Sequence, residues 1–353
     1  MGYRYLPGAA TSAYLDLLDA LLVAPLPSRG VSFIRKKLGG HSYWYMKYTI
    51  GADTRWDYLG PDNAAVGDRI ARVKARLAED APSRVARERL AQTARAAGAH
   101  VSGAAERRVY QALAQSGLFA VGGVLVGTHA WLNIGNMLGV SWLSDEKRTE
   151  DIDVGIRSKD SVSAFALAVP GISERIETAL AHIDPDLFAV PALNRKHPST
   201  SFSLYKRTLR VDLLTPLSGP PAEGPRKIPG VGYAHAMRFL GFVMDDSQPA
   251  AVPAGDGVLV RVPSPGRFAI HKLVVAQRRP AAETAKRRKD MAQASSVIEA
   301  LLDVDPGELD RALVAARQCG SKFMSQLEAG IQALPETMTK ELAGRLGDGS
   351  SKE

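Results

Sequence analysis

The residues best suited to chemistry are two aspartates, Asp151 and Asp153, in the stretch TEDIDVGI. In a strand, side chains alternate faces at roughly 3.3 Å per residue, so both carboxylates point the same way, with Cα atoms roughly 6.6 Å apart. Ile152 and Val154 then face the core. Two such carboxylates can share a pair of divalent cations roughly 3.5 to 4 Å apart, the spacing that serves phosphoryl transfer. Because a DxD pattern is short and common, a charged solvent-facing strand is the alternative.

A strand that leads directly into a helix precedes these acids. LFAVGGVLV has the apolar run of a buried strand, and THAWLNIGNML predicts a helix that opens just after Gly127. A helix N-terminus offers unpaired N–H groups and a partial positive charge, which suit phosphate oxygens. Gly127 lets the backbone come close to a ligand, and the Thr128 hydroxyl can donate a hydrogen bond. A simple N-cap is the alternative role for Thr128.

A third carboxylate, Asp212, lies among apolar residues in TLRVDLLTP, where an unpaired charge is costly. The preceding strand-like run TSFSLYKR predicts a hairpin with this segment. If the Asp212 strand neighbours the DID strand, about 4.8 Å away, the three acids converge on one face of a sheet. The alternative is an ordinary strand whose polar face carries Arg210, Asp212 and Leu214.

A basic segment follows nearer the C-terminus. GRFAIHKLVVAQRR, followed by Pro280, predicts a short helix in which Lys272 lies among apolar residues. A lysine so placed either extends to solvent or binds an anion. From Arg267 to Asp290 there are eight Lys or Arg residues against two acids. Such a cluster attracts phosphate, although a solvated basic helix face is the alternative.

The order of these motifs resembles the nucleotidyltransferase superfamily, whose founding fold is similar to DNA polymerase beta. RTEDIDV, followed by the Lys272 helix and AKRRKDMAQ, is similar to the minimal nucleotidyltransferases related to the AbiEii and MenT-type toxins, and to a family described only as nucleotidyltransferase. The resemblance covers roughly Gly122 to Leu302. It implies an α+β fold, with a nucleotidyltransferase-type mixed sheet flanked by helices.

The resemblance also implies roles for residues near the acids. Gly127 and Thr128 would contact the triphosphate. Asp151 and Asp153 would hold two Mg²⁺ ions, or Mn²⁺ in their place. Asp212 would complete the metal site and help to activate the attacking hydroxyl.

Three further residues have implied roles. Lys272 would bind the nucleotide phosphates, Asp290 would orient Lys272 or the acceptor, and Arg148, just ahead of the DID strand, would contact the nucleotide. The sequence departs from the family in one respect, because 24 positions separate Gly127 from Asp151. The extra length, GNMLGVSWLSDEKR, predicts a loop beside the site.

The function implied is transfer of a nucleoside monophosphate from an NTP to an acceptor hydroxyl, with release of pyrophosphate. By resemblance to the toxins, the acceptor is the 3′ end of tRNA and a possible partner is an antitoxin protein. Two alternatives stay open. One is nucleotidylation of a small molecule or a protein side chain, and the other is a noncatalytic nucleic-acid-binding protein of the same fold.

Composition sets outer limits. The 353 residues are 45% hydrophobic and carry a formal net charge of +8, which favours a polyanionic partner such as nucleic acid or nucleotide. The single cysteine, Cys319, excludes an internal disulfide and a cysteine-rich metal site. No run of about 18 apolar residues predicts a membrane span, and no secretory signal is recognisable at the start. The sequence therefore predicts a cytoplasmic protein with no membrane association.

Five units are expected along the chain. Residues 1–63 predict a helix at 10–24 and a small β-meander, and residues 64–103 predict a helical connector broken at Pro82. Residues 104–262 form the expected nucleotidyltransferase core, with late strands at 237–245 and 257–262. Residues 263–345 form a helical region and residues 346–353 a disordered tail. The C-terminal helices are expected to begin near Pro265, Ala282, Pro306 and Ser321.

The expected meander mixes basic and aromatic residues. These side chains could stack on bases and contact a nucleic-acid backbone, or the aromatics could build the core of a tiny sheet. The residues concerned are Arg35, Lys36, Lys37, Tyr43, Trp44, Tyr45, Lys47, Tyr48 and Trp56.

Overall fold

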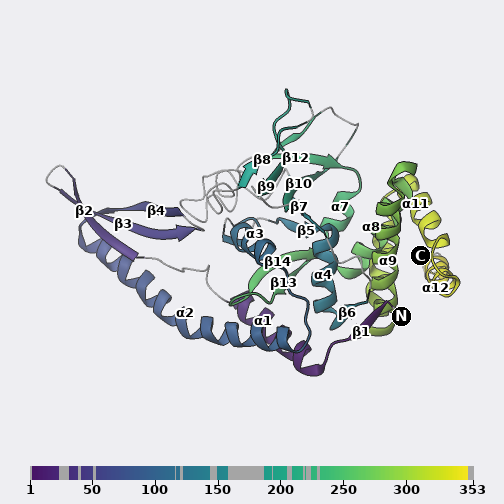
Figure 1. Ribbon diagram of the computed structural model, residues 1–353, viewed down its shortest axis with the longest axis horizontal. Coiled ribbons are helices and arrows are strands. Elements are labelled where there is room, and N and C mark those ends of the chain that lie inside the picture. The colour runs from purple at the N-terminus through teal and green to yellow at the C-terminus, as the bar shows by residue number, and fades with distance from the viewer. Residues whose placement is uncertain are drawn as a thin grey trace.

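A computed structural model of the protein describes residues 2–23, 32–38, 41–50, 53–115, 117–119, 122–143, 149–157, 187–192, 194–204, 209–217, 219, 224–228 and 231–348. In this part of the chain, a mixed sheet is flanked by helices, which confirms the expected α+β class (Figure 1). A three-stranded sheet lies at one end of the molecule and a group of C-terminal helices at the other.

The central sheet has the strand order β11-β12-β10-β7-β5, and β8 joins it through β9. Strand β10 pairs with three others. Strand β7 runs parallel to it along one edge, and β9 and β12 pair with different parts of its other edge. The antiparallel β9–β10 pair confirms the predicted hairpin. The strand bounds are β5 Val124–Val126, β7 Asp151–Gly155, β8 Leu187–Ala189, β9 Ser201–Leu204, β10 Arg210–Pro216, β11 Arg226–Ile228 and β12 Gly232–Met237.

Alternation along β7 and β10 separates the core from the polar face. Ile152, Val154, Val211 and Leu213 are fully buried in the main hydrophobic core, as period-2 alternation requires. That core also receives Trp131 from α4 (Gly127–Met137), which contacts β7. Burying each large apolar side chain contributes about 1.5–3 kcal/mol, so the register of these two strands is strongly fixed.

The C-terminal region is helical, as expected. It comprises α8 (Pro265–Arg278), a 3-10 turn at Ala281–Glu283, α9 (Thr284–Val304), α10 (Pro306–Arg317), α11 (Ser321–Gln332) and α12 (Glu336–Asp348). Proline at the first turn of α8 and α10 marks their starts, because the missing N–H would be unpaired there in any case. The predicted start of the disordered tail, at residue 346, is too early, because α12 continues to Asp348. This helix also buries Leu342 in the core.

The N-terminal part carries β1 (Tyr3–Tyr5), α1 (Gly8–Val23) and the predicted meander, which is β2 (Ser32–Leu38), β3 (His41–Ile50) and β4 (Asp53–Pro61) in antiparallel order. Figure 1 shows this meander at the far end of α2 (Ala64–Ala96), away from the central sheet. The expected break at Pro82 is wrong, because α2 runs through it. A proline costs a helix roughly 3 kcal/mol, which the many strong helix formers around it can offset.

Three other expectations fail where tertiary packing overrides local pattern. The strand before Gly127 is only β5, since residues 117–119 form a turn. The expected loop beside the site contains β6 (Val140–Trp142), which pairs with β1. The late strand expected at 237–245 is wrong in its second half, because residues 240–244 form α7. Strand β13 (Ser247–Val252) follows and pairs with β14 (Val258–Pro263). In β13 the small apolar residues at 250–252 are buried, so packing outweighs the prolines nearby.

Helix α3 (Ala104–Gln115) packs on β14. Within the described residues, no helix combines the length and the apolar character that crossing a bilayer requires.

Candidate active site

The structure brings three predicted acids together on neighbouring strands. In the parallel β7–β10 pair, Asp212 lies opposite Asp153 and Arg210 lies opposite Asp151. Residues 151, 153 and 212 alternate with the buried core residues, so they share the other face of the sheet. Asp151 is exposed, whereas Asp153 and Asp212 are half-buried. The acids therefore gather where β7 and β10 begin and β5 ends.

The acids perturb one another electrostatically. The pKa of Asp153 is raised to about 7, first by burial and then by the neighbouring Asp212, while Lys272 and Arg279 oppose the rise. A small part of this side chain is exposed, although protein surrounds most of it. The pKa of Asp151 is also raised, first by burial and then by Asp212. A group of like charges with raised pKa values is typical of a site that binds a cation.

The three carboxylates are not drawn tightly together. Among the described residues, no three His, Cys, Asp or Glu side chains lie close enough to hold one ion jointly. Asp212 Oδ1 instead accepts hydrogen bonds from Ser201 Oγ at 2.5 Å and from Arg210 Nε at 2.8 Å. The donor set still fits hard divalent cations, which prefer carboxylate oxygens. Asp212 would have to exchange its bond with Arg210 for such an ion.

Gly127 touches the acid group directly. Its φ of +65° lies in the left-handed region, and a Cβ there would lie 2.3 Å from Asp153 Oδ2. Only glycine therefore allows the first residue of α4 to lie against the Asp153 carboxylate. The sequence predicted that the backbone at Gly127 approaches a ligand closely. In the structure, this backbone lies against the Asp153 carboxylate.

We expect the substitution Gly127→Ala to displace Asp153 and to lower stability by about 1–3 kcal/mol, because both the backbone conformation and the contact are incompatible with a side chain. Chemical denaturation measures the loss. The control is Gly67→Ala in α2, where a Cβ would meet nothing within 4 Å. Equal stability of the two variants would contradict this account of Gly127.

Thr128 lies deeper than the sequence suggests. It is buried, and its Oγ1 accepts a hydrogen bond at 3.3 Å from Gln293 Nε2 on α9. The N-cap of α4 is Val126, without a side-chain cap, so the N-cap alternative for Thr128 is wrong. The Thr128 hydroxyl keeps its own proton to donate, but the structure ties this residue to α9.

Lys272 and Asp290 form a buried ion pair beside the acids. Lys272 Nζ donates to Asp290 Oδ1 at 2.7 Å, and Arg279 Nε donates to Asp290 Oδ2 at 2.9 Å. Burial alone would raise the pKa of Asp290, but these two cations hold it below its ordinary value. Lys272 and Arg279 also lower the pKa of Asp153, so the pair lies within electrostatic reach of the acids.

The first turn of α9 also approaches the acids, because Lys286 lowers the pKa of Asp151. Arg148, expected to contact the nucleotide, lies outside the described residues. Sequence reasoning did not single out Ser201 or Gln293, nor the bond of Arg210 to Asp212. The hairpin register could have found Ser201, because it places this residue opposite Asp212.

The raised pKa of Asp153 makes stability depend on pH. Since the folded pKa of about 7 exceeds the usual 3.8, the protonated acid favours folding below about pH 4, and this contribution is lost as pH rises through 7. We expect Asp153→Asn to be more stable than the wild type above pH 7, on the order of 2–4 kcal/mol, and this gain to vanish near pH 4. Denaturation of both proteins from pH 4 to 8.5 tests it; a constant difference contradicts it.

Comparisons with known proteins identify the family of this chain. A family profile described as Nucleotidyltransferase matches residues 105–318, which include every described site residue above. No curated protein matches. Among solved structures, the chain is similar to an antigenic nucleotidyltransferase-like protein from Paracoccidioides brasiliensis, at 16% identity and a TM-score of 0.30, over 64% of this chain and 94% of that one. Because the family profile spans more than half of the sequence, this chain belongs to the nucleotidyltransferase family.

Proposed function

We propose that the protein transfers a nucleoside monophosphate from an NTP to an acceptor hydroxyl and releases pyrophosphate. The observation that carries this proposal is the β7–β10 register, which sets Asp212 beside Asp153 with Asp151 on the same face. Family membership supports the reaction class, and the raised pKa values of Asp151 and Asp153 support cation binding.

Asp151, Asp153 and Asp212 would hold two divalent cations, Mg²⁺ or Mn²⁺. Such ions, when bound, would neutralise charge on the NTP phosphates and favour ionisation of the acceptor hydroxyl. Asp153 must lose its proton to serve as a ligand, so its pKa near 7 couples binding to pH.

The remaining residues position the reactants. The N-terminal amides of α4, at Gly127 and Thr128, would donate to phosphate oxygens, as helix N-termini do. Lys272, oriented by Asp290, would add positive charge beside them. In the transfer, the acceptor oxygen bonds to the α-phosphorus and the bond to the oxygen that bridges the β-phosphorus breaks. Asp212 lies on the acceptor side and takes up the hydroxyl proton.

We propose an RNA 3′ end, such as that of tRNA, as the acceptor. The net charge of +8 and the basic first turn of α9, with Lys286 near Asp151, support a polyanionic acceptor. A toxin role with an antitoxin protein as partner belongs to this proposal and would appear as growth arrest on expression. Acceptors of another class, a small molecule or a protein side chain, are the alternative.

The test is direct. The protein is incubated with each α-labelled NTP, Mg²⁺ and total RNA, with EDTA added to a parallel set. Label should enter RNA with at least one NTP and only without EDTA. Label in a small molecule or in protein would favour the alternative acceptors, and no label with any acceptor or nucleotide would contradict the reaction class.

A further inference from the structure

A cavity lies directly beside the acid group on its β9–β12 side. It has a volume of about 770 Å³, within the range of small-ligand sites. Its walls come from the segment before β9, from the start of β10 and from β12, including Asn194, His197, Ser201, Arg210, His235 and Ala236. Ser201 and Arg210 belong to both the cavity and the Asp212 hydrogen-bond network, so the two sites share a wall.

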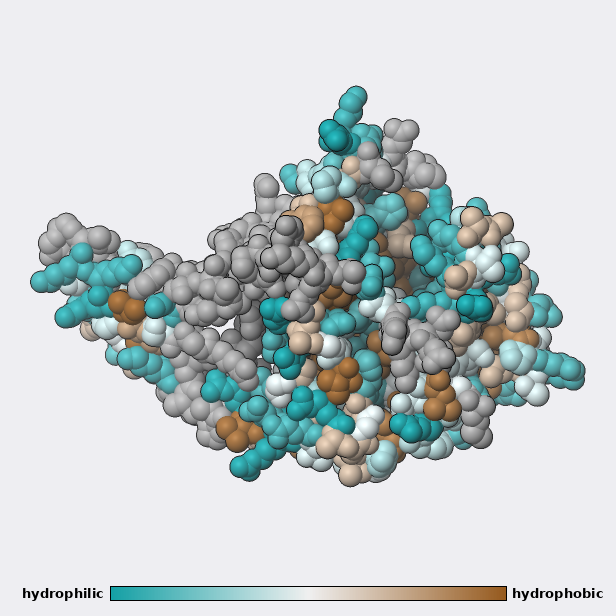
Figure 2. Space-filling view, in the orientation of Figure 1, coloured by the Kyte–Doolittle hydropathy of each residue, from teal (hydrophilic) through white to brown (hydrophobic). Residues whose placement is uncertain are grey.

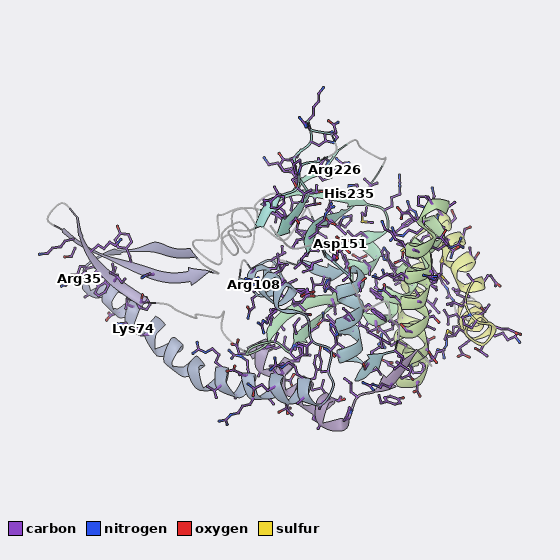
Figure 3. All side chains as sticks on the ribbon, in the orientation of Figure 1. Arg35, Lys74, Arg108, Asp151, Arg226 and His235 are labelled. Carbon is purple, nitrogen blue, oxygen red and sulfur yellow. The ribbon has the colours of Figure 1, made fainter. Side chains whose placement is uncertain are left out.

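The sheet register fixes how far this wall lies from Asp212. His235 pairs with Leu214, two residues beyond Asp212 on β10. Parallel partners and alternate residues share a face, so His235 lies on the Asp212 face with its Cα roughly 8 Å away, given strand spacings of about 4.8 Å and 3.3 Å per residue. Figure 3 places exposed His235 and Asp151 on the same side of the molecule.

The cavity lies opposite the groups that would bind the triphosphate. Gly127 follows β5, at one edge of the sheet, and Lys272 lies on α8. The cavity borders β9 and β12, on the other edge of β10. Phosphoryl transfer needs the attacking and leaving oxygens roughly in line, on opposite sides of the phosphorus. A triphosphate bound between Gly127 and Lys272 therefore directs the acceptor toward the cavity.

The lining indicates which acceptor fits. Arg210 supplies a guanidinium, and its side chain is 45% exposed. None of the described lining residues is acidic. This favours an anionic acceptor over a cationic one such as an aminoglycoside or a lysine side chain. Three prolines (191, 198 and 225) offer flat apolar surface to a ring, and His197, His235 and Asn194 can hydrogen-bond to base edges.

We propose that this cavity holds the terminal nucleotide of a single-stranded RNA acceptor, an inference that rests on the proposed function. Arg210 contacts its phosphate, His197 and His235 contact its base, and its 3′-hydroxyl points to Asp212. Figure 2 shows the surface hollowed between the strands around β12 and the C-terminal helices, on the side where the triphosphate would lie. Phosphate binding would also draw the Arg210 guanidinium from Asp212 Oδ1, which frees that oxygen.

Direct binding tests the cavity without requiring turnover. The probe is a 5′-fluorescein RNA hexamer with a free 3′-hydroxyl, measured by anisotropy with the full-length protein. The cavity variants are His235→Ala, which removes an exposed side chain, and Ala236→Trp, which fills the space. The matched controls are Arg226→Gln, an exposed arginine on β11 outside the lining, and Ala96→Trp at the exposed end of α2.

We expect each cavity variant to weaken hexamer binding at least tenfold while its affinity for a nonhydrolysable NTP stays within twofold. The controls should change neither. Where transfer is measurable, the RNA KM should rise while kcat stays within threefold, which a folding defect would not produce.

Unchanged hexamer binding in both cavity variants, or an equal loss of NTP affinity, would overturn the acceptor-site inference and leave the transferase proposal standing. If the wild type transfers label only to small molecules and does not bind the hexamer, the inference also fails. If no transfer occurs but the cavity variants lose hexamer binding, the cavity assignment stands and the proposed reaction fails.

Discussion

Asp153→Asn should lower nucleotidyl transfer by at least about 10³-fold. Asparagine keeps the size of the side chain but removes the charge that would bind both ions, and each 1.36 kcal/mol of lost transition-state stabilisation costs tenfold in rate. Asp153 lies against Gly127 and beside Asp212, so it is the most central of the three acids. The measurement is kcat/KM for a labelled NTP at saturating RNA.

The matched control for this prediction is Asp246→Asn, an exposed aspartate between α7 and β13. It should leave the rate within twofold. Because Asp153→Asn should be at least as stable as the wild type at neutral pH, a lost rate cannot reflect unfolding. Retention of more than a tenth of wild-type activity would show that the metal site is not built on Asp153.

Asp290→Asn should destabilise the protein by about 3–5 kcal/mol. The carboxylate is only 4% exposed and accepts from both Lys272 and Arg279, so its loss leaves two cations without their buried partner. Its lowered pKa gives the pH dependence: the stabilisation is present above about pH 4, the usual carboxyl pKa, and is lost as pH falls through the folded value. Urea denaturation at pH 7 and at pH 3.5 measures both effects.

Glu283→Gln provides the control, because Glu283 also pairs with Arg279, at 3.1 Å, but is 35% exposed. Exposed pairs contribute about 0–1 kcal/mol, so this variant should be close to wild type. A similar loss of stability in both variants would show that the stabilisation comes from pairing with Arg279 and not from the burial of Asp290. A stable Asp290→Asn protein would mean that the ion pair does not organise α8 and α9.

The sequence predicted the parts of the site that depend on short-range pattern. Alternation in the DID strand placed Asp151 and Asp153 on one face, and the hairpin pattern placed Asp212 on a strand paired with the run before it. The parallel register of β7 and β10 links residues nearly 60 positions apart and no local pattern encodes it. Only the resemblance to a family suggested that the strands were neighbours.

Other features could not be predicted because they arise from tertiary contacts. The burial of Thr128 depends on Gln293, more than 160 residues later. The bond from Arg210 to Asp212 is local, yet charged neighbours on one strand face are equally consistent with solvent exposure. Strand β13 pairs with β14 although Pro249 lies within it and Pro253 follows directly after it.

The proposed transfer depends on the three acids binding divalent cations at the β7–β10 junction. The most direct measurement is a crystal structure of the protein with Mn²⁺ and a nonhydrolysable NTP, with metal positions taken from anomalous scattering. We predict two peaks within about 2.5 Å of carboxylate oxygens of Asp151 and Asp153, one of them also bound by Asp212 after it has left Arg210. Peaks elsewhere, or a bound triphosphate whose phosphates lie away from these acids, would contradict the account.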